Sequence, residues 1–68
     1  MKLIKEYLCD SITPSDEEIM ECLDIVNKED CIVQLTWFFP YNGWHQLCVK
    51  KGMTFKECQD KLPKVYGV

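Results

Sequence analysis

Apolar and polar side chains alternate most regularly over residues 31–51. Alternation with a period of two is typical of a β-strand that buries one of its faces. In the first half the inward set is Cys31, Val33, Leu35, Trp37 and Phe39, and in the second half it is His45, Leu47 and Val49. We therefore predict a β-hairpin with strands at about residues 31–39 and 44–51.

The loop of this hairpin follows from matching the two apolar faces. The pair Asn42-Gly43 favours a two-residue turn, but that turn would place Trp37 opposite Cys48. A slip of one residue moves every side chain to the other face, so this mixing is costly. A three-residue loop at 41–43 places Trp37 opposite Leu47 instead. We expect this loop, or a slightly longer one, with Gly43 in a left-handed conformation.

Three other segments have helical spacing. In residues 2–9 the apolar side chains fall at i, i+1, i+4 and i+5, which predicts a short helix. A helix at about residues 15–28 begins either at Thr13-Pro14 or at the capping box of Ser15 and Glu18. Its apolar face holds Ile19, Met20, Cys22, Leu23 and Val26.

A third helix is predicted at about residues 54–62. Thr54 and Glu57 form a second capping box, and Pro63 ends the helix. The hairpin with this helix, roughly residues 31–62, resembles the opening ββα unit of β-grasp, or ubiquitin-like, proteins. The resemblance rests on the wide hairpin, the turn ending in Gly52 and the cap at Thr54. It carries no functional motif, and a β-grasp sheet needs further strands after that helix.

These elements predict one small two-layer α+β domain spanning residues 1–68, in the order α-α-β-β-α. The hairpin packs on the helices at 15–28 and 54–62, with Trp37 at the centre of the core. A chain of 68 residues has only a marginal core. The tail at 64–68 is too short to assign.

Composition narrows the classes of function. The chain has a net charge of −3, and all eight basic residues are lysine. Arginine is the usual residue for bidentate contacts to phosphate and guanine, so its absence argues against nucleic-acid binding. No apolar run approaches the length of about 20 residues that spans a membrane, and the N-terminus is too charged for a signal peptide. We expect a cytoplasmic protein whose five cysteines are free thiols.

Catalytic and metal-binding patterns are weak. His45 and Cys48 have the spacing of a zinc-ligand pair, but residues three apart on a strand point to opposite faces. No glycine-rich phosphate loop or paired-carboxylate arrangement stands out. We therefore expect a non-enzymatic protein with no cofactor and no metal.

The second face of the hairpin is the most suggestive surface, because Phe38 and Trp44 lie there among polar neighbours. Either the helix at 2–9 or a second copy of the chain would cover this face, or a partner binds it. We predict a protein-binding module, compatible in size with a phage- or mobile-element-encoded modulator of a host protein. The alternatives are a nucleic-acid-binding hairpin that uses Lys50 and Lys51, and a structural homo-oligomer. The predicted contacts are Phe38, Trp44, Tyr41 and Gln46, with an acidic patch of Glu17, Glu21 and Asp24.

Overall fold

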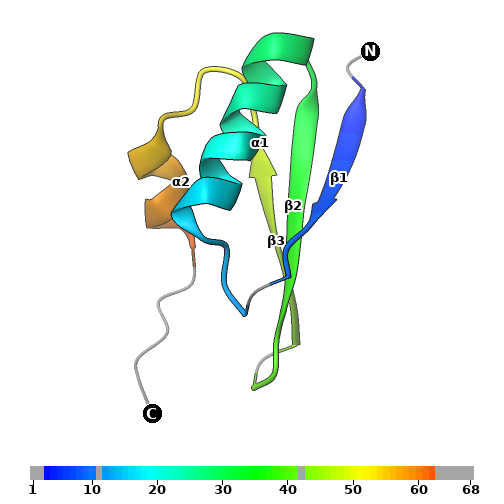
Figure 1. The fold of residues 1–68 in the computed structure, drawn as a ribbon, viewed down its shortest axis with the longest axis vertical. Helices are drawn as coiled ribbons and strands as arrows, with labels where there is room; N and C mark the ends of the chain where they lie inside the picture. The colour runs from blue at the N-terminus through cyan, green and yellow to red at the C-terminus, as the bar shows by residue number, and fades with distance from the viewer. Residues whose placement is uncertain (1–2, 11, 42, 63–68) are drawn as a thin grey trace.

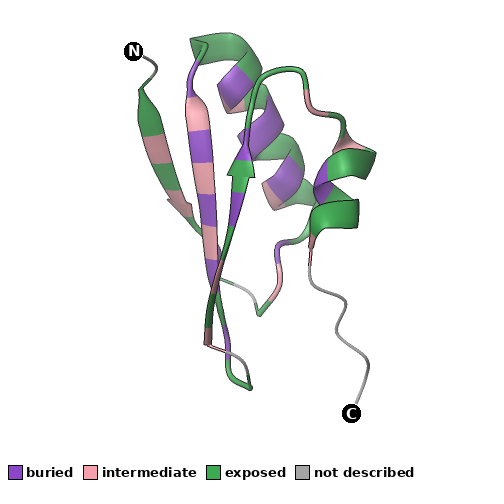
Figure 2. Cartoon of the chain, turned by 180° about the vertical axis from the view of Figure 1, so that it is seen from behind, coloured by how far each residue is buried: buried purple, intermediate pink, exposed green. Residues whose placement is uncertain are grey.

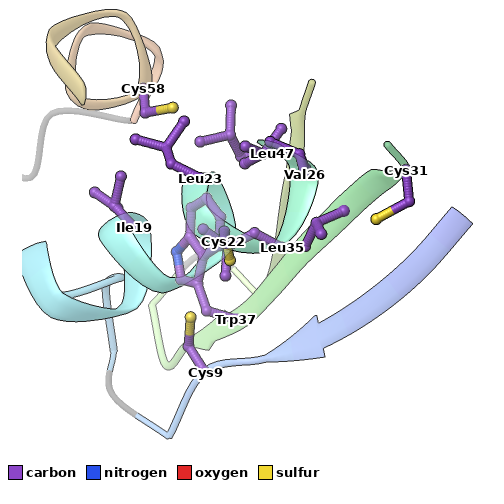
Figure 3. Close-up of a cluster of buried hydrophobic side chains, with 12 residues drawn as sticks. Cys9, Ile19, Cys22, Leu23, Val26, Cys31, Leu35, Trp37, Leu47 and Cys58 are labelled. Atoms are coloured by element: carbon purple, nitrogen blue, oxygen red, sulfur yellow. The ribbon is translucent and has the colours of Figure 1, made fainter. Parts of the chain in front are cut away.

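The computed structural model describes residues 3–10, 12–41 and 43–62. Its elements follow the order β-α-β-β-α (Figure 1): β1 (Ile4–Leu8), α1 (Asp16–Glu29), β2 (Ile32–Phe39), β3 (Gly43–Val49) and α2 (Phe55–Lys61). The strands form one three-stranded sheet in the order β1-β2-β3, with β1 parallel and β3 antiparallel to β2. Both helices lie on the same face of this sheet (Figure 3).

The predicted helix at residues 2–9 is wrong, and so is the order α-α-β-β-α. Residues 4–8 form a strand that pairs with β2 from Ile4 opposite Ile32 to Leu8 opposite Thr36. The ladder is extended at its end by the Cys9 amide, which donates to the carbonyl of Thr36 at 2.8 Å. A helix this short gains little by itself, because its first turn is costly to form. The ladder with β2 therefore overrides the local helical spacing.

The two helices of the structure both begin at a predicted capping box, α1 at Ser15 rather than at Thr13-Pro14, and α2 at Thr54. At α1 the Ser15 hydroxyl accepts a hydrogen bond from the Glu18 amide at 3.2 Å, and the Glu18 carboxylate accepts from the Ser15 amide at 2.9 Å. At α2, Thr54 and Glu57 make the same reciprocal pair, at 3.1 and 3.3 Å. These bonds satisfy amide groups that the first turn of a helix leaves unpaired.

The hairpin keeps the predicted faces in a different register. Phe39 pairs with Gly43, so the loop has three residues, 40–42, and starts one residue earlier than expected. Trp37 therefore lies opposite His45 rather than Leu47, and their rings stack at 5.6 Å between centroids. The shift is of two residues, so no side chain changes face. Gly43 has a φ of +88°, a conformation that glycine adopts without strain.

The core lies between the sheet and the two helices (Figures 2 and 3). Trp37 is 1% exposed and is the largest of the fully buried side chains, as expected. Around it pack Ile19, Cys22, Leu23 and Val26 of α1, Val33 and Leu35 of β2, Leu47 and Val49 of β3, and Cys58 of α2. Met20, predicted to face the core, is 48% exposed. The unassigned tail at 64–68 lies outside the described residues.

Candidate functional site

The face of the sheet turned away from the helices is covered by no element of the described chain. Burial alternates along each strand, as the stripes on β2 show in Figure 2. We call this surface the open face. It presents Ile4, Glu6 and Leu8 from β1, Ile32, Gln34, Thr36 and Phe38 from β2, and Trp44, Gln46 and Cys48 from β3.

Phe38 and Trp44 form the most prominent apolar feature of the open face. They are paired across β2 and β3, and their rings meet edge to face with 5.2 Å between centroids. This geometry is a favoured one for aromatic pairs. Phe38 is 46% exposed and Trp44 63% exposed. Leu8, 64% exposed, sits opposite Thr36, one same-face position from Phe38. We call Phe38 and Trp44, together with their aliphatic neighbour Leu8, the aromatic patch.

The centre of the open face is polar and almost uncharged. The Gln34 side-chain amide donates to the Gln46 side-chain oxygen at 2.9 Å. Glu6, opposite Gln34, is the one charged side chain among the described residues that β1, β2 and β3 turn to this face. An apolar patch beside neutral polar groups is the composition of a protein interface, whose centre is depleted in charge.

The predicted acidic residues do not belong to the open face. Glu17, Glu21 and Asp24 are exposed on α1, on the helix side of the sheet. The Tyr7 hydroxyl, which β1 turns toward α1, donates to the Glu21 carboxylate at 2.7 Å. This hydrogen bond raises the pKa of Tyr7. The acidic patch predicted from the sequence therefore lies on a different side of the sheet from Phe38 and Trp44.

The two remaining predicted contacts, Gln46 and Tyr41, also differ in position. Gln46 lies on the open face next to Trp44 in β3. Tyr41 is 76% exposed at the hairpin tip, but its ring lies 5.5 Å from that of Phe39, which belongs to the buried face. Gln46 therefore borders the aromatic patch, and Tyr41 does not extend it.

Sequence reasoning missed the contribution of β1 to the open face. The helical spacing predicts Ile4 and Leu8 on the apolar side of a helix, whereas the structure leaves both exposed beside β2. Neither alternate set, Ile4-Glu6-Leu8 or Lys5-Tyr7, is uniformly apolar or polar, so no period of two marks this strand in the sequence.

The buried thiols are poor candidates for chemistry. Burial raises the pKa of Cys9 and of Cys22 to about 12, and it also raises the pKa of Cys58. A thiol with a raised pKa holds little of the nucleophilic thiolate. The described residues line no pocket and hold no cluster of three or more metal-ligand side chains. No described helix is long and apolar enough to cross a bilayer.

Comparisons were made with protein-family models, with curated proteins and with solved structures, and none of the three gives a match. The geometry of the open face is therefore the basis for assigning a function.

Proposed function

We propose that this domain binds another protein through the open face, with the aromatic patch at the centre of the contact. The observation that carries the proposal is the edge-to-face pair of Phe38 and Trp44 on a sheet face that no helix covers. Tryptophan is enriched among the residues that dominate binding energy at protein interfaces. Leu8 adds an aliphatic neighbour from β1.

The energetics of the open face favour an apolar, neutral partner surface. Complete burial of a large apolar side chain is worth about 1.5–3 kcal/mol, and the members of the aromatic patch are still largely exposed. Gln34 and Gln46 already hydrogen-bond to each other. A partner that covers them leaves that bond intact, which limits the cost of removing polar groups from water.

Charge supports a protein partner over a nucleic acid. Residues 31–49 contain no lysine, arginine, aspartate or glutamate. Glu6 on the open face would repel phosphate, and Lys51 is 3.8 Å from the Asp30 carboxylate. A titration with single-stranded oligonucleotides at two salt concentrations separates the two functions. Binding that weakens steeply with salt would favour the nucleic acid.

The proposal is tested by the double variant Phe38→Ser with Trp44→Ser. The matched control is Met20→Ser, which removes a side chain of similar exposure, 48%, from α1. Each protein is used to retain partners from an extract of the native host, and retained proteins are quantified by mass spectrometry. Circular dichroism and urea unfolding report the fold. We expect the double variant to stay folded and to lose, by about tenfold or more, a partner that Met20→Ser retains.

Two results would contradict the proposal. If the double variant unfolds, Phe38 and Trp44 are structural residues and not an interface. If it stays folded and retains the same proteins in the same amounts as Met20→Ser, the open face makes no contact with them.

A further inference from the structure

β1 contributes backbone hydrogen bonds to the sheet and little to the core. Its five residues alternate between exposed and half-buried, and Tyr7 packs against the buried cluster without being buried itself. By contrast, α1, β2, β3 and α2 each place at least one buried side chain in that cluster. The apolar burial that holds the helices on the sheet therefore comes mainly from these four elements.

The side-chain contacts between β1 and α1 lie at the surface. Lys5 forms an ion pair with Glu29, and the Tyr7 hydroxyl donates to the Glu21 carboxylate at 2.7 Å. An exposed ion pair contributes little to stability, because water weakens it. The ladder that joins β1 to β2 is parallel, and it is shorter than the antiparallel ladder between β2 and β3. Parallel pairing is also slightly less stable per residue, so the ladder that holds β1 is the weaker of the two.

We infer that β1 is released from the sheet as a unit while α1, β2, β3 and α2 remain folded. Elements with few buried apolar contacts open before the rest of a protein unfolds. Release breaks the bonds at both ends of the ladder: the Ile32 amide loses the Leu3 carbonyl, 2.9 Å away, and the Cys9 amide loses the Thr36 carbonyl, 2.8 Å away. The antiparallel ladder between β2 and β3 stays in place, and the edge of β2 that faced β1 is uncovered.

Release of β1 also dismantles part of the open face. Leu8 belongs to β1, so the released form keeps Phe38 and Trp44 together but lacks the third member of the aromatic patch. This consequence rests on the proposed function. A partner that covers all three side chains binds the docked form more tightly, and a ligand shifts an equilibrium toward the state that it binds better. The partner therefore holds β1 in the sheet, and the docking of β1 regulates partner binding in return.

Native-state hydrogen exchange by NMR tests the release in the unaltered full chain. The Ile32 and Cys9 amides report on β1, and the amides that join β3 to β2 report on the rest of the sheet. We expect Ile32 and Cys9 to have similar protection factors, about tenfold or more below those of β3. Low concentrations of urea should change these two factors little, because release exposes little surface.

Two exchange results would overturn the inference. Protection of Ile32 and Cys9 equal to that of β3, with the same urea dependence, would mean that β1 opens only when the whole domain unfolds. Clearly unequal protection of Ile32 and Cys9 would mean that β1 frays from one end and is not released as a unit.

A pair of variants at Lys5 tests the same release by weakening the ladder. The Leu3 carbonyl and the Cys9 amide both point to β2, so the alternation along a strand turns the Lys5 amide toward β2 as well. Lys5→Pro lacks this donor, whereas Lys5→Ala keeps it, and both lose the ion pair with Glu29. We expect Lys5→Pro to keep the circular dichroism of its helices, a cooperative urea transition and slow exchange in β3. Its Ile32 amide should be protected about tenfold less, or weaker still, than in Lys5→Ala. If Lys5→Pro unfolds the whole chain, or leaves Ile32 as protected as in Lys5→Ala, the inference is overturned.

The regulatory role of β1 is tested by repeating the extract assay with the two Lys5 variants. We expect Lys5→Ala to retain the partner and Lys5→Pro to retain about tenfold less, because a buried leucine is lost from the contact. Equal retention by the two variants would overturn this role. If the Phe38→Ser with Trp44→Ser variant retains every protein, the proposed function fails, while the exchange measurements still decide the release of β1.

Discussion

The two tryptophans lie in opposite environments, one in the core and one on the open face. Trp37 and Trp44 lie on the two neighbouring strands of the hairpin, yet Trp37 is 1% exposed and Trp44 63% exposed. Trp37 belongs to the buried alternate set of β2, and Trp44 belongs to the exposed set of β3. Both assignments follow from the period of two that the sequence displays.

This contrast predicts unequal costs for removing the two rings. Trp37→Ala should lower the free energy of unfolding by about 3–5 kcal/mol, because it leaves a cavity in the core. Trp44→Ala should cost about 0.5–1.5 kcal/mol, the worth of its contact with Phe38. Urea unfolding followed by circular dichroism measures both. Equal losses of stability would contradict the assignment of the two faces.

The five thiols should also react at different rates, because they differ in burial. Cys48 is exposed on the open face, whereas Cys9, Cys22, Cys31 and Cys58 are buried. The raised pKa values of Cys9 and Cys22 further reduce their thiolate fraction near neutral pH. A coloured thiol reagent should therefore react quickly with one thiol in the folded protein and with five after unfolding. Rapid reaction of two or more thiols before unfolding would contradict the packing.

At the scale of elements, local signals predicted the helices and missed β1. A capping box is contained within four residues, so the starts of α1 and α2 could be read directly from Ser15 and Thr54. β1 exists because residues 4–8 find hydrogen-bonding partners in β2, far along the chain. Such a partner leaves no trace in the local spacing of apolar residues. The exact register of the hairpin was missed for another reason: a shift of two residues leaves every side chain on its face, so matching the faces cannot distinguish the two registers.

The caps give a prediction at this scale. Ser15→Ala should lower the free energy of unfolding by about 1 kcal/mol, because the Glu18 amide loses its acceptor. Ser15→Asp should retain most of the stability, since aspartate also caps helices and suits the positive end of the helix dipole. Thermal or urea unfolding of the three proteins provides the comparison. If the Ser15→Ala protein is as stable as the unaltered protein, the Ser15 hydroxyl contributes nothing to the stability of α1.

At the scale of the whole molecule, the open face is a consequence of topology. Two helices cover one side of a three-stranded sheet, and no described element remains for the other side. The sequence was sufficient to identify Phe38, Trp44 and Gln46 as residues of that face. It could not show whether residues 2–9 cover the face or extend it, because both outcomes use the same apolar side chains. The structure makes residues 4–8 part of the sheet, which adds Leu8 to the aromatic patch.

NMR of the two indole N–H groups can show whether Trp44 is exposed in the isolated domain and covered when a partner binds the open face. A soluble paramagnetic agent broadens signals that water can reach, and the Trp44→Phe variant assigns the two signals. We expect the Trp44 signal to be broadened in the free protein and protected when the partner is bound, and the Trp37 signal to be protected in both. A Trp44 signal that is shielded in the free protein, or equally broadened with and without partner, would contradict it.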